Sequence, residues 1–166
     1  MKKWFKRGFL SLLAVFVLIQ FVPVNRTNLP VDPAKKLQPP PEVEAILRES
    51  CYDCHSNETR WPWYSYVAPL SWWIADHVHS GQRHLNLSDW ADWKPRPGRD
   101  AEYRDGPSMS VVQYKRKVLG DMETSIQEGQ MPIASYLWMH PDARMTPEQY
   151  KVVAAWLDAV MIQGAK

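Results

Sequence analysis

The chain has 166 residues, 45% of them hydrophobic and 23% charged, so it is long enough for one folded domain and is not disordered as a whole. Its 2 cysteines are too few for a disulfide scaffold or for a four-cysteine zinc or iron–sulfur site. The net charge of +2 is uneven: four basic residues lie among the first seven, and the remainder carries 16 basic against 18 acidic side chains. Because the body has no basic excess, no nucleic-acid partner is expected.

The N-terminal segment is predicted to bind the membrane. Residues 1–7 form a basic end, and residues 8–24 are apolar apart from Ser11 and Gln20. The length of this apolar run is at the lower limit for a spanning helix. No small-residue cleavage site follows this run, so we favour an uncleaved signal-anchor over a cleaved signal peptide. With the basic end cytoplasmic, the rest of this single-pass protein is expected on the periplasmic or extracytoplasmic side of the cytoplasmic membrane.

The rest of the chain reads as a linker followed by a helical domain. Residues 25–40 are rich in proline and are expected to form a stiff, extended linker, and residues 41–166 are expected to form the domain. Apolar residues at helical spacing, helix-start prolines and capping residues predict its helices, and the polar, proline-containing residues 89–107 predict a loop. No segment alternates as a strand does, so the expected class is all-α with long ordered loops. The expected helices are residues 41–51, 70–81, 110–128 and 146–163.

Both cysteines belong to one motif, C-x-x-C-H, formed by Cys51, Cys54 and His55. This is the attachment motif for c-type haem: one turn of chain presents two thiols to the two vinyl groups of the porphyrin, and the adjacent histidine reaches the iron as the proximal ligand. The sequence therefore predicts one covalently bound haem c. A thioredoxin-like thiol pair is the first alternative, although no strand-to-helix setting is visible, and a zinc site completed by distant histidines is the second.

A second iron ligand is expected on the other face of the haem. Met131 is the first candidate, because the following Pro132 biases it toward an extended conformation, and a thioether raises the reduction potential relative to a second imidazole. Met131 could instead only pack against the protein, as the other methionines do. The rival ligands are histidines, and an open distal site is the remaining alternative. These histidines are His77, the first alternative, followed by His79, His84 and His140.

The chain resembles the bacterial haem-binding domain family with a single C-x-x-C-H motif. The resemblance extends from about Pro40 to the C-terminus, and the order of its parts is similar to that of class I cytochromes c, with a late Met-Pro and a closing helix. It implies a cytochrome c-like helical haem domain and supports Met131 by analogy. The stretches that carry it are residues 50–57, 61–64, 72–73, 77–78 and 85–90, then Met131-Pro132, Tyr136, residues 140–143 and the last helix.

An unusual number of aromatic residues follows the haem motif, with eight Trp and Tyr side chains concentrated between residues 61 and 93. We expect them to form the wall of the haem pocket and part of the core, and a docking surface for a redox partner is the other reading. The expected function is a membrane-anchored monohaem c-type cytochrome that exchanges electrons with redox partner proteins, more an electron carrier than a catalyst. A haem sensor or peroxidase-like enzyme with an open or histidine-lined distal site is the alternative, and a non-redox haem module is a third.

Overall fold

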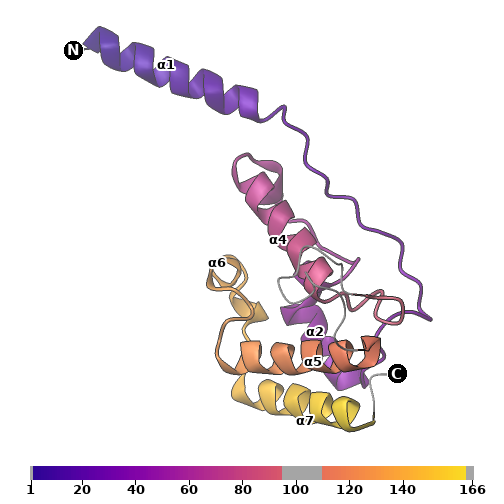
Figure 1. The fold of residues 1–166 in the computed structure, drawn as a ribbon. Helices are drawn as coiled ribbons and strands as arrows, with labels where there is room; N and C mark the ends of the chain where they lie inside the picture. The colour runs from indigo at the N-terminus through magenta and orange to yellow at the C-terminus, as the bar shows by residue number, and fades with distance from the viewer. Residues whose placement is uncertain (1, 95–109, 164–166) are drawn as a thin grey trace.

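The computed structural model describes residues 2–94 and 110–163 and consists of helices joined by loops (Figure 1). Neither of these ranges contains a strand, which confirms the all-α class. In chain order the helices are α1 (Lys2–Ile19), α2 (Pro41–Ser50), α3 (Tyr52–His55), the 3-10 helix η1 (Trp63–Tyr66), α4 (Leu70–His84), α5 (Val111–Gln127), α6 (Ala134–Leu137), the 3-10 helix η3 (Pro141–Ala143) and α7 (Pro147–Gln163).

The four helices expected in the domain are present as α2, α4, α5 and α7. The hydroxyl of Ser110 accepts a hydrogen bond from the Gln113 backbone N–H, and the Gln113 side chain accepts one from the Ser110 N–H, so a capping box starts α5. Gly129 follows this helix with a φ of 69°, a conformation that glycine adopts without strain. Of the expected loop, residues 89–92 form turns and a bend, residues 93–94 have no regular structure, and residues 95–107 lie outside the described residues.

The core lies between α2, α5 and α7. Helices α5 and α7 run side by side (Figure 1), and α2 packs against α7. The side chains of Leu47, Leu119 and Leu157, one from each of these helices, are completely buried. Trp90 and Trp93 from the loop after α4 join this cluster, and the Trp93 ring stacks on both Trp90 and Tyr114. This part of the aromatic block therefore belongs to the core, as expected.

The N-terminal helix differs from the prediction. Helix α1 begins at Lys2 rather than residue 8, so four basic residues lie in its first turns, and it ends at Ile19. Residues 8–19 account for about 18 Å of helix, which is less than the roughly 30 Å thickness of the bilayer core. None of the helices in the described part of the chain is both long and apolar enough to span a membrane, and the spanning helix expected at residues 8–24 is thus not found.

The segment after α1 is extended and hydrogen-bonded to the domain at several points. The Gln20 side chain donates to the Ala68 carbonyl at 3.2 Å and accepts from the Ala68 N–H at 2.9 Å. The Asn28 amide donates to the Thr59 carbonyl at 2.8 Å. Within residues 25–40, expected as an extended linker, Leu37 is 7% exposed and belongs to the core cluster, so this segment is in contact with the domain.

Candidate haem site

The C-x-x-C-H motif lies at the junction of α2 and α3. Cys51 follows the last residue of α2, and Cys54 and His55 end the short helix α3. Exposure varies along the motif in a pattern suited to a ligand: Cys51, Cys54 and His55 remain partly accessible, whereas the two intervening residues, Tyr52 and Asp53, are buried in the protein. The two thiols and the imidazole are thus the groups that the motif presents to a cavity.

The ring of His55 is held by two backbone carbonyls. Its Nδ1 lies 3.0 Å from the Gly81 oxygen and 3.2 Å from the Leu85 oxygen. Carbonyl oxygens only accept hydrogen bonds, so Nδ1 must carry the proton and Nε2 keeps its lone pair. Burial lowers the pKa of His55, which also favours the neutral ring. This is the tautomer that an iron ligand requires, and the carbonyls fix the orientation of the ring.

Gly81 allows α4 to approach the motif closely. A Cβ at this position would lie 2.5 Å from the carbonyl oxygen of Cys54, so the packing of α4 on α3 requires glycine here. We expected Gly81 to end the helix, but α4 continues to His84, because this glycine serves helix packing rather than termination. Its importance was missed in the sequence, although a glycine inside a helical pattern is itself a signal of close backbone approach.

A buried polar network fixes the chain that follows the motif. The Asn57 backbone N–H donates to the Ser88 hydroxyl at 3.1 Å, and the Asn86 side chain donates to Asn57 Oδ1 at 2.9 Å. The Ser56 hydroxyl, fully buried, donates to the Tyr52 carbonyl at 2.8 Å. These residues lie in two of the stretches on which the family resemblance rests, and their shared role is to hold the motif against the loop after α4.

The chemistry of the two thiols does not match the alternatives to haem. Burial raises the pKa of Cys51 to about 12 and that of Cys54 to about 11. A thioredoxin-like pair needs a thiol with a lowered pKa, which this site does not provide. Among the described residues, no three His, Cys, Asp or Glu side chains are grouped so that they could hold a metal ion, which leaves the zinc alternative without geometric support.

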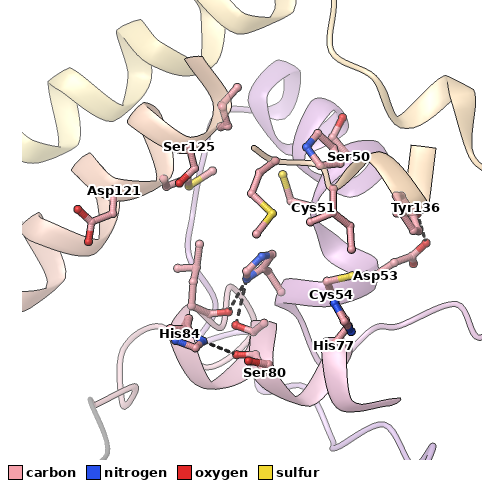
Figure 2. A pocket seen from close by; sticks show the side chains of 18 of the residues that line it. Ser50, Cys51, Asp53, Cys54, His77, Ser80, His84, Asp121, Ser125 and Tyr136 are labelled. Carbon is pink, nitrogen blue, oxygen red and sulfur yellow. Dashed lines mark hydrogen bonds between the residues drawn. The ribbon is translucent and has the colours of Figure 1, made fainter. Parts of the chain in front are cut away.

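The motif faces a cavity of about 670 Å³ between α3, α4, α5 and the segment after α5. This volume lies within the range of about 300–1,000 Å³ that is typical of cofactor sites. Figure 2 shows Cys51 and Cys54 on one side of the cavity and Asp121 and Ser125 of α5 on another. Apolar walls, two thiols and a correctly oriented imidazole form a set of groups that fits a covalently bound haem.

Three methionines line this cavity: Met122, Met131 and Met145. Met122 and Met145 also pack against the core cluster, whereas Met131 is not among the residues packed there and is 42% exposed. Met131 belongs to a stretch that we call the distal segment, residues 130–143, which runs from the end of α5 through α6 and η3. Of the three methionines, Met131 is thus the one whose side chain is least involved in core packing.

The histidines considered as rival ligands are divided by the structure. His77 and His84 line the cavity, and each places its Nδ1 within 2.9 Å of a backbone carbonyl of its own helix, Trp73 for the first and Ser80 for the second. His79 and His140 are not among the lining residues. His140 instead lies 2.6 Å from the hydroxyl of Tyr64. Of the four histidines, His77 and His84 are therefore the two that lie at the cavity.

The aromatic block does not form the wall of the large cavity. Among the described residues that line this cavity there is no tryptophan, and the aromatic rings present are those of Tyr114 and Tyr136. Trp61 and Trp73 line a much smaller adjoining cavity of about 60 Å³, while Trp63 is 73% exposed. The expectation of an aromatic pocket wall was wrong for these tryptophans because composition does not indicate which side of a helix or loop faces the ligand.

Comparison with known proteins agrees with this geometry. No curated protein and no solved structure matches the chain. The family model for a haem-binding domain matches residues 14–159, which include the motif, the cavity and the distal segment. The chain therefore belongs to the haem-binding domain family.

Proposed function

We propose that this protein is a monohaem c-type cytochrome that transfers electrons on the extracytoplasmic side of the cytoplasmic membrane. Cys51 and Cys54 bind the haem covalently, His55 is the proximal iron ligand and Met131 the distal one. The observation that carries the proposal is the fixed tautomer of His55, whose Nε2 is left free beside the two cavity thiols. Family membership supports the cofactor, and the motif supports covalent attachment.

The residues of the site hold the haem and control its surroundings. Cys51 and Cys54 would hold the haem through two thioethers, because the addition of each S–H across a vinyl double bond would need no external oxidant. The Gly81 and Leu85 carbonyls hold the proton on His55 Nδ1 and so increase the basicity of Nε2. The bound haem supplies an iron that gains and loses one electron. If His55 and Met131 both held the iron, no position would be open to a substrate, which would favour an electron carrier.

Covalent attachment and the distal ligand are tested together. The purified holoprotein should keep its haem after denaturation and extraction with acidified organic solvent. Its oxidised form should show the weak far-red absorption band of methionine-ligated iron, and Met131→Ala should abolish this band. His77→Ala is the matched control, because His77 lines the same cavity and should leave the band unchanged. An unchanged spectrum in Met131→Ala would show that Met131 is not the ligand.

One observation favours the alternative, a haem sensor or peroxidase-like enzyme. The Nδ1 atom of His77 lies 2.9 Å from the Trp73 carbonyl, so Nε2 is unprotonated in the neutral ring and is available as a proton acceptor beside an open distal position. In that case the oxidised protein would be high-spin, and the reduced protein would bind carbon monoxide at once. His77→Ala would then alter the spectrum, and Met131→Ala would not.

A further inference from the structure

Two side-chain hydrogen bonds join the distal segment to the haem motif and to the chain that follows it. The Tyr136 hydroxyl donates to Asp53 Oδ2 at 2.7 Å, across 83 positions of sequence (Figure 2). His140 Nε2 lies 2.6 Å from the Tyr64 hydroxyl, 76 positions away. Met131 itself is tied locally, since its backbone N–H donates to the Ser125 carbonyl at the end of α5. Residues 136 and 140 therefore link the distal segment to the part of the chain that contains the haem motif.

The acceptor of the Tyr136 bond is itself held in place. Asp53 is only 8% exposed and lies between the two cysteines of the motif. Its Oδ1 accepts hydrogen bonds from the Arg60 backbone N–H at 3.0 Å and from Arg60 Nε at 3.1 Å. Its Oδ2 accepts the bond from Tyr136 at 2.7 Å and a longer one from Arg60 Nη2 at 3.4 Å. A carboxylate with bonds on both oxygens is a fixed anchor point, and a hydrogen bond to it is stronger than one between neutral groups.

The ring of Tyr136 is also held in place. It stacks on the His140 ring at a centroid distance of 4.3 Å and an interplanar angle of 14°, and His140 Nε2 is in turn hydrogen-bonded to the Tyr64 hydroxyl. Burial raises the pKa of Tyr136, and the bond to Asp53 raises it further, so the phenol remains a donor over the physiological range. Tyr136 also lines the cavity, in the same segment as Met131 and five residues after it.

We propose that Tyr136 is a positioning residue, which holds the distal segment against Asp53 of the haem motif and so keeps Met131 over the iron site. The inference rests on the haem site of the proposed function. Methionine sulfur is a weak ligand, and Met131 is partly exposed on a segment whose neighbours Trp138 and Met139 are 88% and 53% exposed. Little apolar packing therefore holds this segment, and the bond from Tyr136 to the motif restricts its distance from the iron.

The test is competition by imidazole for the distal face of the oxidised holoprotein. Tyr136→Phe keeps the ring and its stacking but removes the donor to Asp53. Tyr52→Phe is the matched control, since Tyr52 lies within the same motif and donates to the carboxylate of Glu44 at 2.8 Å, but does not line the cavity. We expect Tyr136→Phe to bind imidazole about ten-fold more tightly, the effect of losing one charge-assisted hydrogen bond, and Tyr52→Phe to match wild type.

Equal imidazole affinity in wild type and Tyr136→Phe would overturn the proposal. An equal gain of imidazole affinity in Tyr136→Phe and Tyr52→Phe would also overturn it, because general loosening of the fold would then explain the gain. Asp53→Asn is the second variant, which keeps an oxygen acceptor but loses the charge, and it should give a smaller gain than Tyr136→Phe. If wild type lacks the methionine band, the proposed ligand is wrong, but imidazole affinity still reports how Tyr136 controls access to the iron. If no haem is bound, hydrogen exchange of residues 130–137 decides: it should rise in Tyr136→Phe and not in Tyr52→Phe.

Discussion

The two sides of the haem cavity are built differently. On the side of the motif, the backbone carbonyls of α4 hold His55, Gly81 allows α4 to approach Cys54 closely, and the fully buried Ser56 and Ser88 take part in a polar network. On the other side, the distal segment is short of buried apolar contacts, and Ala143 is its buried hydrophobic residue. The motif side is held by many buried hydrogen bonds and close contacts, whereas the distal segment is held by a few.

This difference separates two tasks of a haem protein. The side of the cavity that must present both thiols and one imidazole nitrogen at fixed positions needs a rigid support, because small displacements prevent attachment and ligation. A distal ligand on a more exposed segment is easier to displace, since local opening there disrupts little packing. Substitutions on the motif side should therefore affect haem attachment and stability, whereas those on the distal segment should affect ligand exchange.

Removing both thiols should give the largest effect. Cys51→Ala combined with Cys54→Ala leaves His55 in place but abolishes every thioether, so no haem should remain with the protein after denaturation and solvent extraction. Each single variant is the control and should retain haem through its remaining cysteine. Haem that resists extraction in the double variant would contradict covalent attachment at this motif.

Truncating a side chain should lower the free energy of unfolding far more in the core than in the distal segment. Leu47 of α2 is completely buried, and Leu47→Ala should lower the free energy of unfolding by about 2–5 kcal/mol. Trp138→Ala removes a larger side chain from the distal segment, but that side chain is 88% exposed, and the change should stay within about 0.5 kcal/mol. Urea unfolding of both variants measures the difference. A cost for Trp138→Ala close to that of Leu47→Ala would show that the distal segment is packed more firmly than its exposure indicates.

Two glycines in helices provide a sharper comparison. Alanine at Gly81 would place its Cβ 2.5 Å from the Cys54 carbonyl oxygen, so α4 must move away, at a cost of about 1–3 kcal/mol. At Gly120 of α5 the nearest atom is the Met161 sulfur at 3.9 Å, an ordinary contact. Gly120→Ala should therefore stabilise the protein by about 0.5–1 kcal/mol, through higher helix propensity. Thermal unfolding should show shifts of opposite sign, and a gain in stability for Gly81→Ala would contradict the close approach.

Local patterns predicted much of this arrangement. Apolar spacing and capping residues identified the four helices of the domain, and C-x-x-C-H identified a turn that lines the cavity, because each of these signals lies within a few neighbouring residues. The roles of Gly81 and Tyr136 could not be derived in this way, since their partners Cys54 and Asp53 are distant in sequence. Tyr136 entered the sequence comparison only as part of the family resemblance, without a role.

The N-terminal region and the aromatic block show the same limit. The contacts of Gln20 with Ala68 and of Asn28 with Thr59 are bonds to backbone atoms far along the chain, for which the sequence offers no local signature. The number of tryptophans does not indicate where their rings point: Trp90 is 2% exposed and Trp63 is 73% exposed, although both belong to the same aromatic block. Which rings reach the cavity depends on how the helices pack.

The smallest expected effect concerns the acidic limit of the motif side. Burial alone would raise the pKa of Glu44, but hydrogen bonds from Lys36 and Tyr52 outweigh it and hold this pKa below its ordinary value of 4.5. A carboxylate with a lowered pKa stabilises the folded state above its ordinary pKa, and this contribution is lost as the pH falls through the folded-state value.

Glu44→Gln keeps an acceptor for Tyr52 but removes the charge. Its deficit in unfolding free energy, on the order of 1 kcal/mol or less at pH 7, should therefore shrink toward pH 3 in urea titrations of the holoprotein. Glu42 is exposed on the same helix, so Glu42→Gln controls for the loss of one charge. If the loss of unfolding free energy in Glu44→Gln did not depend on pH, the bonds from Lys36 and Tyr52 would not favour the ionised carboxylate.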